Sequence, residues 1–290
     1  MMEEVWGQRY DDRLHLRHGP IDLQIRVDGF GRRQAYEAAR IRFGSLLHGL
    51  VAELVHHRRQ LKPSYPQPRD VTARRMYEAA GPFASKYWLT PMIAVAGSVA
   101  DEVLATMTRV TKDIERAYVN NGGDIAMFLR PDQCFSAAIV SPSGYDLGRI
   151  HVRSDDGAKG IATSGQSGRS FSFGIADAVT VVAHSAASAD VAATLIANEV
   201  DVPDHRGIER MPANTLFPDS DLNDFEVVTN VPELSESDIT AALVRGSKCA
   251  QKMLQDDLID AAALFLQGQA IIIGTDSHFE LSHQLEVDIA

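Results

Sequence analysis

The sequence has 290 residues, 45% of them hydrophobic and 23% charged, which is the composition of a globular protein with a buried core. Its 28 Lys and Arg stand against 39 Asp and Glu, a formal net charge of -11. This acidity argues against a nucleic-acid partner, because no basic face would attract a phosphate backbone. Neither a membrane span nor the apolar segment of a signal peptide is found, so we expect a cytoplasmic protein without membrane contact.

The two cysteines of the sequence indicate packed thiols. Cys134 and Cys249 lie far apart, with neither a CxxC spacing nor a histidine cluster beside them. This arrangement supports neither a zinc site nor a disulfide.

The first third of the chain predicts a strand and several helices. Residues 21–27 alternate between apolar and polar side chains and predict a strand that ends at Asp28-Gly29. One long amphipathic helix is predicted over residues 33–61, because apolar residues recur there at helical spacing: Ile41, Leu46, Leu47, Leu50, Leu54 and Val55. Asp70 or Thr72 then caps a short helix that ends near Gly81.

Pro91 suits the first turn of a further helix over residues 92–107. Its segment AVAGSVA has only small or β-branched side chains, which let a helix lie close to a neighbour. That neighbour is either a sheet or a ligand.

The middle of the chain predicts a sheet. Residues 113–120 and 124–129 form a hairpin around the turn at 121–123, and further strands follow at 135–140 and 149–153. The β-branched segment 178–183 predicts a buried strand, which leads into a helix over 189–199.

The last third predicts a second set of strands and helices. Residues 201–224 indicate a long ordered loop, and residues 226–231 a strand. Ser235 caps a helical stretch that reaches residue 267 in two pieces, with a break near Gly246. Strands at 270–274 and 278–283 end the chain, so the order indicates a duplicated α+β layout.

Three short segments have residues suited to ligand binding. In the first, Gly122 and Gly123 precede Asp124; adjacent glycines let a ligand approach backbone amides, but they also form an ordinary hairpin turn. The second, residues 160–170, combines glycines and hydroxyls with Arg169 and suits a phosphate group. A solvated Ser/Gly loop is the alternative.

The third segment is a carboxylate and a hydroxyl one helical turn apart. Asp190 and Thr194 direct their oxygens to one side of a helix, as Mg²⁺ or Ca²⁺ would require. The alternative is structural: Asp190 favours the helix N-terminus by its charge, and Thr194 bonds back into the preceding turn.

The order of these segments resembles the ApbE family, whose members use FAD to attach FMN covalently to other proteins. The series GGDI, GIATSG, AVTVVA and AD-x-x-x-T covers residues 120–194. The resemblance implies a duplicated T-fold of antiparallel sheets with packed helices, an α+β fold. It implies Mg²⁺ ligands at Asp190 and Thr194. It also implies cofactor-binding residues in both loops: Gly122, Gly123, Asp124, Ala162, Thr163, Ser164 and Gly165.

A closer resemblance is to a branch of uncharacterised ApbE-like proteins. They share T-P-M-x-A-V-A-G at residues 90–97, S-G-R-S-F-S-F-G-x-A-D-A at 167–178 and P-D-S-D-L at 218–222. The His-x-x-Asp-Pro-x-Thr-Gly element of true flavin transferases is missing between ATSG and the following strand. In its place Arg169, Ser170 and Ser172 become candidate anion contacts, and Phe171 or Phe173 could stack on a planar ring. A half-buried strand is the alternative for the two phenylalanines.

No catalytic triad is visible, and Asp124 and Asp177 are the candidate general bases. His184 ends a strand where ligands often lie.

We expect residues 1–290 to form a single ApbE-like domain of two intimately packed α+β halves. The first hypothesis is an ApbE-like protein that binds a nucleotide- or pterin-like cofactor, with Mg²⁺ and transferase-like chemistry; FAD itself is disfavoured by the missing element. A divergent FAD-dependent FMN transferase and a non-catalytic scaffold are the alternatives, and a homodimer is expected by analogy.

Overall fold

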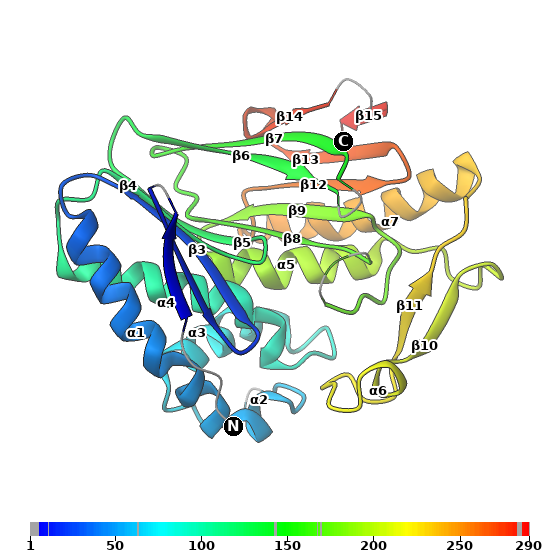
Figure 1. The fold of residues 1–290 in the computed structure, drawn as a ribbon. Helices are drawn as coiled ribbons and strands as arrows, with labels where there is room; N and C mark the ends of the chain where they lie inside the picture. The colour runs from blue at the N-terminus through cyan, green and yellow to red at the C-terminus, as the bar shows by residue number, and fades with distance from the viewer. Residues whose placement is uncertain are drawn as a thin grey trace. The chain divides into compact units, whose positions relative to one another are not determined.

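A computed structural model describes residues 6–10, 12–62, 64–141, 144–166, 168, 170–282 and 286–289. Figure 1 shows the helices and strands of the chain. The chain divides into two compact units. Unit 1 comprises Met1–Cys134, Arg153–Ile161 and His184–Val191, and unit 2 comprises Phe135–Val152, Ala162–Ala183 and Ala192–Ala290. Each unit is described by itself below.

The sheet of unit 1 is antiparallel. Its strands follow the order β1-β2-β3-β4-β5, and β5 pairs with the first two residues of β8. Alternate residues of β3 are buried, in register with the buried residues of β2, so one face of the sheet belongs to the core. The strands are β1 (Trp6–Tyr10), β2 (Arg13–His18), β3 (Ile21–Asp28), β4 (Arg116–Asn121), β5 (Asp124–Leu129) and β8 (Gly160–Ser164).

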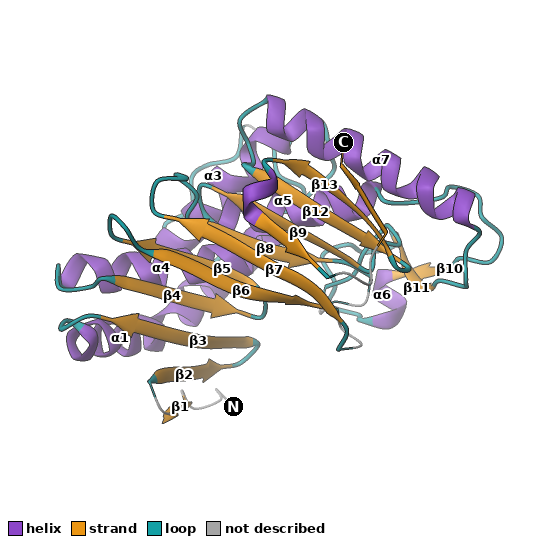
Figure 2. Cartoon of the chain, turned by 90° about the horizontal axis from the view of Figure 1, so that it is seen from above, coloured by secondary structure: helices purple, strands orange, loops and turns teal. Residues whose placement is uncertain are grey.

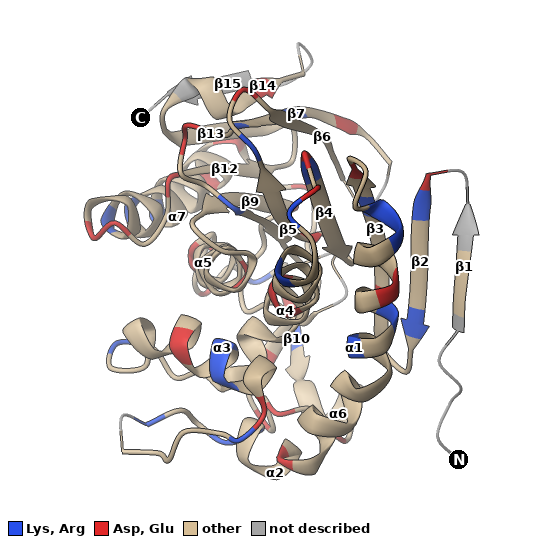
Figure 3. Cartoon of the chain, turned by 90° about the vertical axis from the view of Figure 1, so that its left-hand side faces the viewer, with Lys and Arg blue, Asp and Glu red and all other residues tan. Residues whose placement is uncertain are grey.

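Helices pack on this sheet. The helix α4 lies on β4 and β5, and α1 lies on β2, β3 and α4. Charged residues of both signs occur along α1 (Figure 3). The helical segments are α1 (Arg32–Ala52), α2 (Leu54–His57), α3 (Val71–Ala80), α4 (Val95–Val110) and the 3₁₀ turns η1 (Gly81–Phe83) and η2 (Pro91–Ala94).

The long helix predicted over residues 33–61 is in fact two helices. The chain leaves helical geometry at Glu53, whose φ is -117°. The Glu53 carboxylate accepts hydrogen bonds from the backbone amides of Arg69 and Asp70, so tertiary contacts stabilise the break. The predicted apolar face was also partly wrong, because Ile41 and Val55 are 69% and 67% exposed.

The other helix signals of unit 1 are confirmed. Asp70 accepts hydrogen bonds from the first-turn amides of α3, as a capping aspartate should. Pro91 begins the short turn η2, and the α-helix proper begins at Val95. A Cβ at Gly97 would lie 2.7 Å from the backbone nitrogen of Ala187, so the small residues of α4 serve close packing between chain segments.

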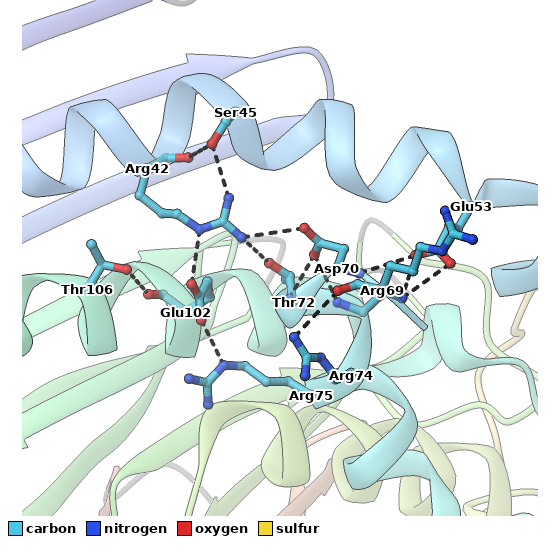
Figure 4. Close-up of polar contacts among 11 residues, drawn as sticks. Arg42, Ser45, Glu53, Arg69, Asp70, Thr72, Arg74, Arg75, Glu102 and Thr106 are labelled. Atoms are coloured by element: carbon cyan, nitrogen blue, oxygen red, sulfur yellow. Dashed lines mark hydrogen bonds and ion pairs between the residues drawn. The ribbon is translucent and has the colours of Figure 1, made fainter. Parts of the chain in front are cut away.

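A buried ion-pair cluster connects three helices of unit 1 (Figure 4). Glu102 of α4 is 3% exposed and accepts hydrogen bonds from Arg42 of α1 at 3.0 Å and from Arg75 of α3 at 3.1 Å. Arg42 also donates to the Thr72 hydroxyl at 3.0 Å. One carboxylate therefore compensates two guanidinium groups from two neighbouring helices.

Unit 2 contains further antiparallel strands. The order is β8-β9-β12-β13-β15; β12 pairs antiparallel with β9 and with β13, and β13 pairs parallel with β15. Smaller sheets join β14-β7-β6 and β10-β11. All residues of β9 and β12 are buried. The strands are β6 (Cys134–Val140), β7 (Asp146–Arg153), β9 (Ala178–Ala183), β10 (Glu209–Pro212), β11 (Glu226–Asn230), β12 (Ala261–Leu266), β13 (Gln269–Gly274), β14 (Phe279–Leu281) and β15 (Glu286–Ile289).

The helices of unit 2 include α7, which packs on β12 and β13 (Figure 2). The helix α5 starts in unit 1 and continues into unit 2. The helical segments are α5 (Ala186–Glu199), α6 (Ala213–Leu216), α7 (Glu236–Gln255) and the 3₁₀ turn η3 (Asp276–His278).

Three sequence predictions in the last third are corrected. The expected loop over 201–224 contains β10 and α6. The helix α7 runs through Gly246 without a break. The glycine serves packing instead, because a Cβ at this position would lie 2.9 Å from Leu264 Cδ2. The apolar run Ala261–Leu266 is a strand, paired on both sides with β9 and β13.

The predicted α+β fold of antiparallel sheets with packed helices is confirmed. Among the described residues, no helix combines the length and the apolar character that crossing a bilayer demands.

Candidate functional site

The glycine turn of unit 1 is a hairpin tied to the start of α4. Gly122 and Gly123 have φ values of 70° and 117°, which L side chains rarely adopt. The Asn120 side chain accepts a hydrogen bond from the Gly123 amide at 2.9 Å. The Asn121 side chain donates to the Ala96 carbonyl at 3.1 Å, so the turn is held near the first residues of α4.

Asp124, at the end of this turn, lies near enough to a second carboxylate, Asp190 of α5, for the two charges to interact. Burial and the negative charge of Asp190 raise the pKa of Asp124 well above its ordinary value. Burial also raises the pKa of Asp190, to about 7, and the charge of Asp101 adds to this rise. The Gly97 amide opposes it by donating to Asp190 Oδ2 at 3.0 Å. The structure therefore brings together two predicted site residues that are 66 positions apart.

Asp101 belongs to the same group, although the sequence analysis missed it. Its two carboxylate oxygens accept hydrogen bonds from the first amides of α5, from Ala186 at 3.1 Å and Ala187 at 2.9 Å. Burial raises the pKa of Asp101, and these two hydrogen bonds lower it. A carboxylate three residues after Ser98 in a helix of small residues was the only signal in the sequence, and helix periodicity alone does not reveal its partner.

His184 is exposed beside the same helix start. Its Nε2 lies 3.1 Å from the Ser188 hydroxyl oxygen, and the Ser185 hydroxyl accepts a hydrogen bond from the Ser188 amide at 3.1 Å. Ser185 therefore caps α5, and His184 contacts a residue of its first turn.

The ATSG segment lies in unit 2 and carries a short series of hydroxyls. The Thr163 and Thr180 hydroxyl oxygens are 2.9 Å apart, and Thr194 donates to Ser164 at 3.5 Å. Ala162 is buried in the strand. A Cβ at Gly165 would lie 2.5 Å from the carbonyl oxygen of Asp177, so this glycine permits a close backbone approach.

The loop after ATSG is held by unit 2 itself. Ser167 and Arg169 lie outside the described residues, and Ser170 is exposed. The buried Ser172 hydroxyl lies 3.4 Å from Asn198 Oδ1 and accepts a hydrogen bond from Gly174. The rings of Phe173 and Phe225 are 5.9 Å apart, so an intramolecular contact already occupies Phe173.

Asp177 has partners that fix the backbone. Its carboxylate accepts a 2.6 Å hydrogen bond from the Gln267 amide and another from the Gln166 side chain. Burial raises its pKa, and these hydrogen bonds lower it. Asp177, a candidate general base from the sequence, therefore also has a structural role, because it connects two turns of unit 2.

The donor set of unit 1 suits a hard cation. Two neighbouring carboxylates with raised pKa values are the oxygen ligands that Mg²⁺ prefers, and carbonyl groups and water can complete its coordination. Within the described ranges, no group of three or more His, Cys, Asp and Glu side chains is arranged to hold a metal.

Fold and site together define an α+β protein with an acidic, oxygen-lined candidate cation site. The chain belongs to the family described as AbpE bacteria, whose model matches residues 5–272.

Its curated relatives include UPF0280 proteins from archaea. The protein from Methanothermobacter thermautotrophicus is 36% identical over 116 residues, which cover 39% of this chain and 44% of the relative. The protein from Methanopyrus kandleri is 40% identical over 127 residues, which cover 43% and 48%. The chain thus aligns with about half the length of these relatives.

Two solved structures are also similar. One is the flavinyl transferase ApbE of Pseudomonas stutzeri in its apo form, with 13% identity, a TM-score of 0.46, and coverage of 97% of this chain and 95% of the other. The other is the ApbE protein of Thermotoga maritima, with 14% identity, a TM-score of 0.44, and coverage of 81% and 98%.

Proposed function

We propose that this protein binds a nucleotide- or pterin-like cofactor together with Mg²⁺, with Asp190 as the principal protein ligand of the cation. The Asp124–Asp190 pair carries the proposal. Burial and neighbouring negative charge make ionisation of these two carboxylates unfavourable. A bound divalent cation would offset this cost, because its positive charge stabilises the ionised form. Thr194 follows Asp190 by one turn of α5 and is the second proposed ligand.

The proposed cofactor contacts are accessible backbone and hydroxyl groups. Gly123 has no atom within 4 Å of its Cβ position, and Thr163 is exposed. The accessible backbone at Gly122 in unit 1 suits the phosphate-like part of a cofactor, and so do the hydroxyls near Ser164 in unit 2, each taken by itself. Arg169 is the proposed cation for that part. Bound Mg²⁺ would neutralise phosphate charge.

The reaction class that we favour is transferase-like. We also propose that the protein acts in the cytoplasm and that it forms a homodimer. FAD-dependent FMN transfer is the alternative enzyme function, and the missing His-x-x-Asp-Pro-x-Thr-Gly element speaks against it. A scaffold without catalysis is the second alternative, and the Asp124–Asp190 pair speaks against that, since a scaffold gains nothing from crowded carboxylates.

A thermal-shift panel tests the proposal. The purified protein is heated with FAD, FMN, nucleotides or reduced pterins, each with and without Mg²⁺. A ligand at 100 times its Kd stabilises the folded state by about 2.7 kcal/mol, which raises Tm by several degrees. We expect a nucleotide or pterin to raise Tm more in the presence of Mg²⁺ than in its absence.

Two variants make the panel specific. Asp190→Ala should abolish the Mg²⁺-dependent part of the shift, whereas Asp224→Ala, a change at an exposed aspartate, should preserve it. An FAD shift that Asp190→Ala removes would favour FMN transfer instead. No shift with any ligand would contradict both binding functions and leave the scaffold.

A further inference from the structure

The first turns of α4 and α5 contact each other inside unit 1. A helix leaves its first amides without intrahelical partners, and here both helix starts lie side by side. The Gly97 amide of α4 donates to Asp190 of α5, and the Ala186 and Ala187 amides of α5 donate to Asp101 of α4. Each helix thus caps the other.

The two caps have the same spacing. Gly97 precedes Asp101 by four residues, and Ala186 precedes Asp190 by four. Each helix therefore presents a first-turn amide and, one turn later, a carboxylate on the same face. When two such faces pack together, the amides of each helix donate hydrogen bonds to the carboxylate of the other helix.

The carboxylates of Asp101 and Asp190 reduce the electrostatic repulsion between the N-termini of α4 and α5. Each helix N-terminus has a partial positive charge of about half an elementary charge, so two adjacent N-termini repel each other unless negative groups lie between them. Both oxygens of Asp101 are engaged by α5, so the start of α5 is already capped by the protein. Asp190 uses Oδ2 for Gly97.

We propose that Asp101 is a positioning residue for Asp190: its cap on α5 sets the place of α5 against α4 and thereby the orientation of the Asp190 carboxylate towards Asp124. The inference rests on the proposed function where it concerns Mg²⁺. The reciprocal cap can be tested without any metal.

The metal test compares two changes of the same chemistry. Asp101→Asn replaces a carboxylate that caps α5, and Asp70→Asn replaces one that caps α3 through Thr72 and Ala73. Binding of Mn²⁺, as a probe for Mg²⁺, is measured by calorimetry well below the Tm of each variant. Loss of an outer partner typically weakens metal binding about 10- to 100-fold. We expect at least a 10-fold weaker Kd for Asp101→Asn and an unchanged Kd for Asp70→Asn.

The metal-free test is amide hydrogen exchange of the folded protein in EDTA. Asp101→Asn removes the negative charge and one of the two acceptor oxygens, so at least one of the Ala186 and Ala187 amides loses its partner and exchanges faster whether or not the caps are coupled. If the caps act together, the Gly97 amide, which Asp101 does not contact, also exchanges faster. Unchanged Gly97 exchange would overturn the proposal, because the two caps would then be independent.

The two readouts separate the possible failures. Suppose that the wild-type protein binds no Mn²⁺, but that the Gly97 amide exchanges faster in Asp101→Asn than in wild type. This result would contradict the metal part of the proposed function and support the reciprocal cap. Equal loss of Mn²⁺ binding in the Asp101 and Asp70 variants would overturn the positioning role. If Asp101→Asn does not fold, Asp101→Glu retains the charge and moves it by one methylene, and the same two measurements apply.

Discussion

At the scale of single residues, the buried Glu102 and the half-buried Asp101 and Asp190 differ in which groups compensate the carboxylate charge. Asp101 and Asp190 accept hydrogen bonds from backbone amides, whereas Glu102, the neighbour of Asp101, contacts two arginines. Amide dipoles compensate a negative charge only in part, so the pKa values of Asp101 and Asp190 remain raised. The proposed cation would favour the ionised form of Asp190, because it would supply the missing positive charge.

A buried histidine should make unit 1 sensitive to acid. His57 is 0% exposed, and neither ring nitrogen has a hydrogen-bond partner in the described part of the chain. Its ring meets that of Tyr77 edge-on at 5.8 Å. Burial lowers the pKa of His57 below 6.5, and the nearby His56 lowers it further, while Glu53 and Asp70 oppose this.

The sign of the pH effect follows from proton binding. Between the lowered folded pKa and 6.5 the unfolded chain binds more protons than the folded one, so stability falls as pH falls below 6.5. His57→Phe should raise the unfolding free energy by about 1–2 kcal/mol at pH 5 and by less at pH 7.5. Urea unfolding at both pH values measures this. The exposed neighbour supplies the control, His56→Gln, and equal pH dependence in His57→Phe and wild type would contradict the explanation.

At the scale of elements, glycines inside helices have opposite roles in the two units. Gly246 of α7 lies against Val200 and Leu264, so an added Cβ has no room. Gly44 of α1 has no atom within 4 Å of its Cβ position. The same substitution should therefore change stability in opposite directions.

We expect Gly246→Ala to destabilise the protein by about 1–2 kcal/mol, because overpacking outweighs the gain in helix propensity. Gly44→Ala should stabilise it by about 0.5–1 kcal/mol through propensity alone. Urea unfolding of both variants compares them directly. Stabilisation by Gly246→Ala would show that α7 can move away from β12.

The Glu102 cluster should be the strongest polar contribution to the packing of α1, α3 and α4. Glu102→Gln removes the buried carboxylate shared by Arg42 and Arg75, whereas Arg42 keeps a longer ion pair of 3.7 Å with Asp70, and we expect a loss of about 3 kcal/mol. Glu78→Gln, at an exposed position of α3, should change stability by less than about 0.5 kcal/mol. A loss of the same size in both variants would contradict the role of the cluster.

At the scale of the whole molecule, the net charge of -11 opposes association with polyanions. Fluorescence anisotropy with a random DNA duplex at physiological salt should therefore show no binding at micromolar protein. Binding that weakens with added salt would reveal phosphate contacts and contradict this expectation.

Local signals in the sequence were reliable where neighbours in the chain decide the structure. Positive φ values at Gly122 and Gly123, and the cap at Asp70, follow from glycine flexibility and side-chain reach within a few residues. The α+β class and the family resemblance were likewise visible, because both depend on order along the chain.

The tertiary structure decided whatever depends on distant partners. Ala261–Leu266 is a strand because β9 and β13 pair with it, although its composition alone also permitted a helix. Asp101 meets Ala186 across 85 positions, and no local pattern encodes that contact. The Asp190–Thr194 spacing was thus visible in the sequence, whereas the charge environment on which the proposed cation role of Asp190 rests arises only when α4, β5 and α5 come together.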